Sequence, residues 1–222
     1  MWNRGWDNIF KKNKWGKYPD MSVIRFIANG YKKKNKKKLK ILEVGCGTGA
    51  NLSFFIEEGF NTYGIDGSKV AIKLAKKKLK KEKKNSKLFV GDIQNMPFRS
   101  NYFDCIVDCE CIYSNSFSDS KIILKEIKRI LKRKGSFFSK TFANGTYGDN
   151  NGVKLNGERN SYLKIKKGSF HKGYGLIRLS SLRDIKDLYG KLFKIQKIEY
   201  EYRTILNMKK KIKEWLISMT SN

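Results

Sequence analysis

The sequence is poor in histidine and cysteine and has no long apolar run, and each shortage excludes a class of protein. It holds one histidine and no C-x-x-C pair in 222 residues, so it offers no plausible zinc-binding set. Three of its four cysteines, Cys105, Cys109 and Cys111, share one apolar run where they cannot easily pair, and we expect reduced thiols. No run approaches the ~18 residues of a membrane span, and the N-terminus lacks a secretory signal. We therefore expect a cytoplasmic protein without a metal site.

Acidic residues are also scarce, and the net charge of +29 raises the question of a polyanionic partner such as RNA. The excess comes from 40 lysines against nine arginines, in a chain with only two prolines. Residues with A/T-rich codons are abundant throughout, so genome composition alone could produce this balance. Arginine, the preferred residue for bidentate phosphate and base contacts, is not enriched. Nucleic acid is therefore an alternative partner that the charge alone does not favour.

The remaining composition, 40% hydrophobic and 13% aromatic, suits one α/β domain. We expect residues 1–38 to form an N-terminal helical cap and basic linker, and residues 39–222 to form the main domain. Within it, residues 143–175 show no clear period and are expected to be a long loop. The expected strands are residues 39–44, 61–65, 87–90, 103–109, 136–142, 193–203 and 215–219, and the expected helices are 50–58, a long one capped by Ser68, 118–131 and 181–189.

The sharpest signal is a glycine-rich turn between a strand and a helix, in residues 41–51. Gly45, Gly47 and Gly49 allow the backbone to approach a ligand closely, and the N–H groups of the following helix face that ligand. With Asp66 about twenty residues on, the turn also satisfies the loose dinucleotide fingerprint. The turn alone predicts a nucleotide-like cofactor without separating its kinds.

Three acidic residues at strand ends separate the kinds of cofactor. Glu43 lies two residues before the turn, and Asp66 at the end of the second strand can accept two hydrogen bonds from ribose hydroxyls. Asp92 follows the third strand, within residues 91–98. An NAD-dependent oxidoreductase would leave Glu43 and Asp92 unexplained.

These segments, in this order and spacing, resemble the class I S-adenosylmethionine-dependent methyltransferases over about residues 39–142. The resemblance implies a three-layer Rossmann-like α/β fold, with a mostly parallel seven-stranded sheet, an antiparallel last strand and helices on both faces. It implies S-adenosyl-L-methionine as the cofactor, with Glu43 beside its methionine part, Asp66 on the ribose, and Asp92 with Ile93 on the adenine. The other residues assigned to cofactor binding are Gly45, Cys46, Gly47, Gly49, Gly67, Asp108 and Tyr18.

The acceptor of the methyl group is expected beyond the fourth strand, near Glu110 and Tyr113. No Asn/Asp-Pro-Pro-aromatic motif occurs there, which counts against an exocyclic amine of DNA. Tyr113 and His171 are the candidate catalytic residues, because a histidine of near-neutral pKa suits an O-methyl transfer. We expect a small-molecule acceptor, O-methylated and anionic, sugar or nucleotide-linked, enclosed by the 143–175 loop and the N-terminal cap. The alternatives are an RNA methyltransferase and a non-enzymatic partner of another methyltransferase, and the oligomeric state is open.

Overall fold

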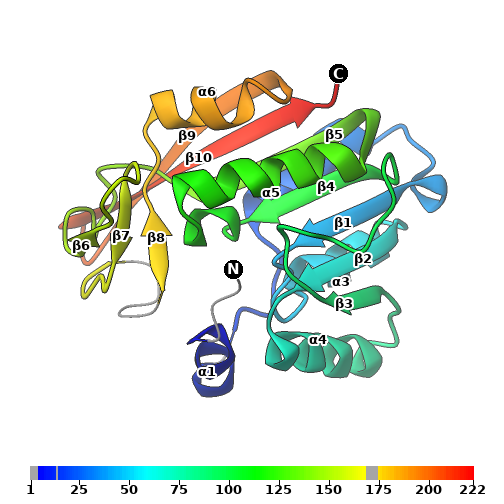
Figure 1. Cartoon of the computed structure of the whole chain (residues 1–222). Coiled ribbons are helices and arrows are strands. Elements are labelled where there is room, and N and C mark those ends of the chain that lie inside the picture. Colours follow the sequence, from blue (N-terminus) through cyan, green and yellow to red (C-terminus); the bar gives the residue numbers. More distant parts are fainter. Residues whose placement is uncertain (1–4, 14, 169–174) are drawn as a thin grey trace.

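The core of the molecule is a seven-stranded sheet in the order β3-β2-β1-β4-β5-β10-β9 (Figure 1). This computed structural model describes residues 5–13, 15–168 and 175–222. β1 to β5 run parallel, whereas β10 is antiparallel to both of its neighbours, β5 and β9. The last strand is therefore the only one reversed in this sheet, and the predicted fold class is confirmed. The strands are β1 (Lys40–Val44), β2 (Asn61–Asp66), β3 (Lys87–Val90), β4 (Phe103–Cys109), β5 (Leu131–Phe142), β9 (Lys194–Ile205) and β10 (Lys210–Thr220).

Helices cover both faces of the sheet because successive strand residues point to opposite sides. Leu42, Ile106 and Phe137 pack against α5 and α6 in one apolar cluster. Their chain neighbours Ile41 and Phe138 pack against α2, α3 and α4 in a second cluster. The result is three layers. The helices are α1 (Gly5–Lys12), α2 (Met21–Tyr31), α3 (Ala50–Glu57), α4 (Lys69–Lys81), α5 (Phe117–Ile130) and α6 (Leu182–Tyr189).

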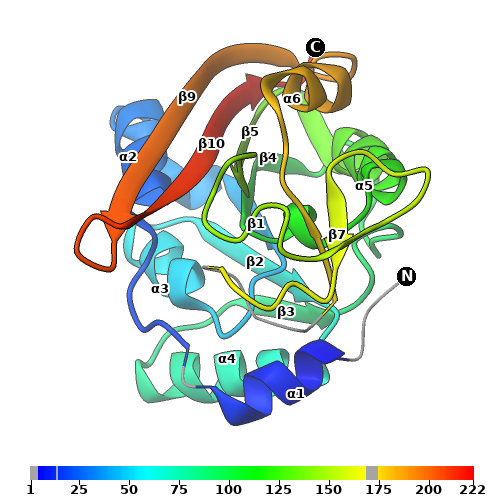
Figure 2. The same cartoon turned by 90° about the vertical axis from the view of Figure 1, so that its left-hand side faces the viewer.

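The N-terminal residues form two helices that lie on different parts of the main domain. α2 packs on the sheet, where the ring of Phe26 stacks on Phe138 at 4.9 Å between centroids. α1 lies beside α4 (Figure 2). The segment between them therefore crosses from one element to the other along the carboxyl edge of the sheet. The division at residue 38 stays a prediction.

Residues 143–175, expected as a loop, contain two short strands. β6 (Val153–Lys154) and β7 (Ser161–Leu163) join β8 (Leu176–Arg178) in a small antiparallel sheet. Strands of two or three residues are too short to show a period in the sequence. Tyr162 and Ile177 pack with Tyr113 and Phe142, so this sheet adjoins the carboxyl ends of β4 and β5.

Candidate functional site

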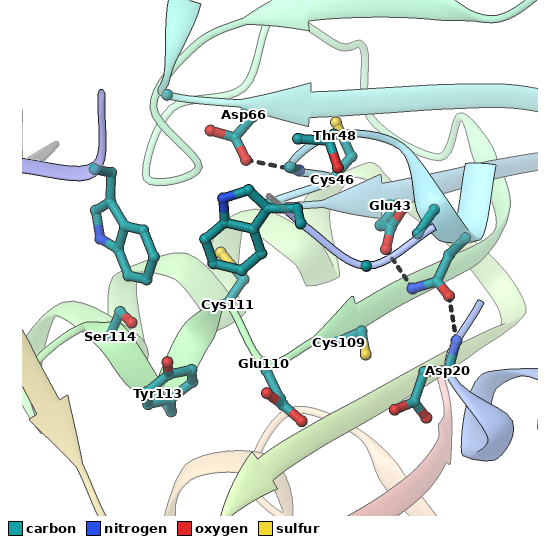
Figure 3. Close-up of a pocket in the computed structure, with 18 of the residues that line it drawn as sticks. Asp20, Glu43, Cys46, Thr48, Asp66, Cys109, Glu110, Cys111, Tyr113 and Ser114 are labelled. Carbon is teal, nitrogen blue, oxygen red and sulfur yellow. Dashed lines mark hydrogen bonds between the residues drawn. The ribbon is translucent and has the colours of Figure 1, made fainter. Parts of the chain in front are cut away.

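A cavity of about 600 Å³ lies at the carboxyl ends of β1, β2 and β4, beneath the N-terminal segment (Figure 3). Of the described residues that line it, none is a lysine, an arginine or a histidine. The carboxylates that line the cavity are Asp20, Glu43, Asp66, Asp92 and Glu110, and the aromatic residues are Trp6, Phe10, Trp15, Tyr18, Tyr113 and Phe142.

The glycine turn between β1 and α3 forms one wall. Gly45 has a φ of 65°, and a Cβ added to it would lie 2.2 Å from Cys111 Sγ, so only glycine fits. A Cβ on Gly47 would lie 3.6 Å from Phe10 Cε1, which places that ring of α1 over the turn. Gly49 begins α3 at a φ of 81° and lies against Ala75, outside the cavity lining.

Glu43 presents a buried carboxylate with one unpartnered oxygen. Asn51 Nδ2 donates to its Oε1 at 2.7 Å, whereas Oε2 is buried without a hydrogen-bond partner. Burial raises the pKa of Glu43 to about 8, and the hydrogen bond from Asn51 opposes that shift. A buried acceptor on a cavity wall is a group that a bound donor or cation would satisfy.

Asp66 ends β2 and is held by the backbone on both sides. Its Oδ2 accepts from Gly47 N at 2.9 Å and its Oδ1 from Ser68 N at 2.8 Å. Burial raises the pKa of Asp66 to about 6, against the two backbone hydrogen bonds that lower it. Ser68 begins α4 and contacts Asp7 of α1 through its hydroxyl, so α1 is anchored beside this carboxylate.

The turn after β3 supplies the next predicted group. Asp92 and Ile93 both line the cavity, with Gly91 and Gly67 beside them. Asp92 Oδ1 accepts from Gln94 N at 2.9 Å, which closes the turn and leaves the Ile93 backbone beside the cavity. Cys46 lines it as well, between the glycines.

Asp108, by contrast, does not line the cavity. It is fully buried and accepts from Cys111 N at 3.0 Å, from Ile112 N at 3.1 Å and from Ser139 Oγ at 2.6 Å. Burial is the largest cause that raises its pKa to about 6. It therefore shapes the turn after β4, which carries Tyr113 to the cavity wall (Figure 3).

Tyr113 is buried and its ring meets Phe142 edge-on at 4.9 Å between centroids. Burial raises its pKa, so the hydroxyl keeps its proton at neutral pH. Tyr18 is 78% exposed, with its ring at the rim of the cavity. His171 lies outside the described residues.

The cluster around Lys140 was not foreseen from the sequence. Lys140 Nζ, on β5, lies 2.8 Å from Asp20 Oδ2, 3.2 Å from Glu110 Oε1 and 3.2 Å from Glu214 Oε1. These carboxylates raise the pKa of Lys140 against the opposing effect of burial. The four residues come from distant parts of the chain, so no local pattern could have joined them.

The cysteines and the possible metal ligands can be located among the described residues. All four cysteines are free, and Cys46, Cys109 and Cys111 line the cavity. No group of histidine, cysteine and carboxylate side chains in residues 5–13, 15–168 and 175–222 could hold a metal ion. Among the same residues, we find no helix with the length and apolar content that crossing a membrane requires.

Comparisons with known proteins find similarity to methyltransferases. A family model described as a methyltransferase domain matches residues 42–139. The chain is 35% identical over 98 residues to a demethylmenaquinone methyltransferase of Thermotoga maritima, covering 43% of this chain and 40% of that protein. It is 28% identical over 125 residues to a ubiquinone biosynthesis O-methyltransferase of Pelagibacter ubique, covering 56% and 51%. The chain thus spans about half or less of the length of these curated relatives.

A solved structure shares the fold at low identity. A SAM-dependent methyltransferase of Methanosarcina mazei superposes with a TM-score of 0.72 at 19% identity, over 88% of this chain and 96% of that one. That likeness establishes the fold, and the family match spans the strands that carry the glycine turn and Asp66.

Proposed function

We propose that this chain, like the class I S-adenosylmethionine-dependent methyltransferases whose fold and domain it resembles, transfers a methyl group from S-adenosylmethionine to a small molecule. The proposal rests on one observation: the cavity that the glycine turn lines is also lined by the aromatic rings of Tyr113 and Phe142. Cofactor and acceptor can therefore meet within it, away from bulk water.

The residues at the cofactor end fit S-adenosylmethionine by their chemistry. The Asp66 carboxylate suits the ribose hydroxyls, and the unpartnered Glu43 Oε2 suits the ammonium of the methionine part. Gly45, Gly47 and Gly67 leave room beside the backbone, and Asp92 with Ile93 would hold the adenine. When bound, the cofactor supplies a methyl group on a sulfonium.

The other residues assigned to cofactor binding would act less directly. Gly49 would act by starting α3, and Asp108 by holding the turn after β4, since neither lines the cavity. Cys46 lies between the glycines, and Tyr18 at the rim would close over the bound cofactor.

For transfer, the protein has to align the acceptor with the sulfonium carbon and accept a proton where one is released. Tyr113 would serve alignment, because burial raises its pKa and a protonated hydroxyl can donate a hydrogen bond to the acceptor but cannot act as a base. His171 remains the proposed base.

O-methylation of an anionic, sugar or nucleotide-linked acceptor also stays a prediction. The lysines that motivated the anionic part do not line the described cavity, so this part lacks a binding group there. The RNA alternative rests on surface charge alone, because no cationic group lines the described cavity itself.

The proposal is tested by calorimetric titration of S-adenosylhomocysteine into the wild-type protein and into Asp66→Ala. We expect binding to the wild type and a loss of about tenfold or more in the variant, because a charge-assisted pair of hydrogen bonds is removed. Asp187→Ala, on α6 and outside the cavity lining, is the control. Tight binding to Asp66→Ala would contradict the assignment of the ribose site.

The acceptor class is tested by transfer of radiolabelled methyl into a fractionated cell extract, with nucleic acid, protein and small molecules counted separately. We expect label in the small-molecule pool. Label in RNA would show instead that the +29 charge serves binding.

A further inference from the structure

The cavity has more negative charge than the proposed cofactor requires. Glu43, Asp66 and Asp92 stand at the ends of β1, β2 and β3, where the cofactor is proposed to bind. Asp20 and Glu110 remain, on the other side of the cavity, near Cys109 and Tyr113 (Figure 3). In a chain of net charge +29, a negatively charged end of the cavity is unexpected.

Lys140 does not neutralise this end. One ammonium faces three carboxylates, those of Asp20, Glu110 and Glu214. Even with Glu214 protonated, as its pKa of about 8 from burial and from the neighbouring Glu110 implies at neutral pH, the acids outnumber the cation. The surplus faces the cavity through Glu110, whose side chain is about a third exposed and which lines the wall, whereas Lys140 and Glu214 are buried behind it.

Aromatic rings border the cavity from two sides. Phe10 lies 4.8 Å from Trp15 and 6.0 Å from Trp6 between ring centroids, and these rings come from the N-terminal segment. Tyr113 and Phe142 lie on the side of β4 and β5. Aromatic faces attract cations electrostatically, and they also pack against apolar groups.

Glu43 provides an independent sign that the cavity takes a cationic group. Its carboxylate is 4% exposed, lines the cavity, and leaves Oε2 without a partner. An unmet buried acceptor is costly unless a ligand donates to it. The cofactor's ammonium would occupy Glu43, so the carboxylates of Asp20 and Glu110 are the lining acids left for a second cationic group.

We propose that the acceptor is a small molecule with a basic amine on an apolar or aromatic body, and that Glu110 binds that amine. This inference rests on the proposed methyl transfer and names its substrate class. The acceptor ammonium gives one proton to Glu110, and the nitrogen lone pair then forms the N–C bond. The C–S bond breaks with its electron pair left on sulfur, and the proton passes to solvent. The products are the methylated ammonium, S-adenosylhomocysteine and one proton.

The test compares three probes of similar shape on the protein saturated with S-adenosylhomocysteine: 2-phenylethylamine, 2-phenylethanol and 3-phenylpropanoate. We expect calorimetry to show the amine binding about tenfold or more tightly than the other two, because only the amine pairs with a carboxylate and an aromatic face. Equal binding of the three, or tighter binding of the carboxylate, would overturn the inference.

Glu110→Gln separates the role of this residue from a general effect of charge. We expect it to remove the preference for the amine while the affinity for S-adenosylhomocysteine stays unchanged. Glu199→Gln, an exposed carboxylate on β9, is the matched control and should keep the preference. A preserved preference in Glu110→Gln would overturn the assignment. Because S-adenosylhomocysteine is titrated first, its failure to bind would refute the proposed function, whereas binding without amine preference refutes this inference alone.

Discussion

At the scale of single residues, the glycine turn depends on space as much as on backbone freedom. Gly45→Ala would place a Cβ 2.2 Å from Cys111 Sγ and 2.4 Å from Cys111 Cβ at a positive φ. We expect a loss of about 3 kcal/mol in the free energy of unfolding, from overpacking and from the left-handed backbone. Urea titration measures it.

The clash and the backbone cost can be separated. Cys111→Gly removes both clashing atoms, so the double variant with Gly45→Ala should regain part of the loss. Gly157→Ala has a similar φ of 73° with no heavy atom within 4 Å of the added Cβ, and it measures the backbone cost alone. Strictly additive effects of Gly45→Ala and Cys111→Gly would contradict the contact.

Glu43 should make stability depend on pH with a definite sign. Its folded pKa of about 8 lies above the ordinary value of 4.5, so between these values the folded protein keeps a proton that the unfolded chain has released. Stability therefore falls as pH rises through this window. Glu43→Gln does not titrate, and we expect its stability relative to wild type to increase from pH 5 to pH 8, by on the order of a few kcal/mol.

Urea titrations at pH 5, 7 and 9 measure this difference. Glu57→Gln, at an exposed site on α3, is the control and should show little change with pH. A difference between Glu43→Gln and wild type that is the same at every pH would show that burial does not perturb this carboxylate.

The residue types at the strand ends could be predicted because they follow sharp local patterns. Glu43, Asp66 and Asp92 each come next to a strand, and all three line the cavity. Asp108 fits the same pattern but faces the interior, because the direction of a side chain at a strand end depends on the turn that follows.

At the scale of elements, α1 should control access to the cofactor end more than it controls global stability. Phe10 is buried against the glycine turn, and Asp7 contacts Ser68. Phe10→Ala should release the helix locally, because a terminal helix can detach without the sheet unfolding. We expect faster amide exchange in residues 5–12, weaker binding of S-adenosylhomocysteine by about tenfold, and little change in Tm.

Exchange mass spectrometry and calorimetry measure these effects, with the exposed Lys12→Ala as control. A large fall in Tm, together with unchanged exchange in α1, would show that the helix belongs to the cooperative core.

Elements of four or more residues with a clear apolar pattern could be predicted from sequence, whereas strands of two or three residues and non-local clusters could not. The strands at residues 87–90 and 103–109 match in both bounds. β5 begins at Leu131, whereas the predicted strand begins at residue 136. The added part contains the charged residues 132–134, which do not show the apolar pattern of a buried strand. β6 and β7 were not predicted because they are only two and three residues long. The Lys140 cluster was not predicted because its members lie far apart in the sequence and meet only in the folded sheet.

At the scale of the whole molecule, a net charge of +29 should oppose the compact state through self-repulsion. Salt shortens the screening length from about 10 Å at 0.1 M to about 3 Å at 1 M. We expect the free energy of unfolding to increase by on the order of 1 kcal/mol over this range. Urea midpoints in sodium chloride measure it, and a midpoint that falls with salt would show that attractive pairs outweigh the repulsion.

One amide joins the two ends of the cavity. Asn51 donates to Glu43 Oε1, and its Oδ1 accepts from the backbone N–H of Asp20 at 2.9 Å. A ligand that draws Glu43 toward itself therefore pulls on the residue that begins α2 and contacts Lys140. We expect this connection to couple the two proposed sites, and any coupling factor is reciprocal: if the donor tightens acceptor binding, the acceptor tightens donor binding equally. With positive coupling, the methyl donor would dissociate more slowly from the protein while an acceptor is bound.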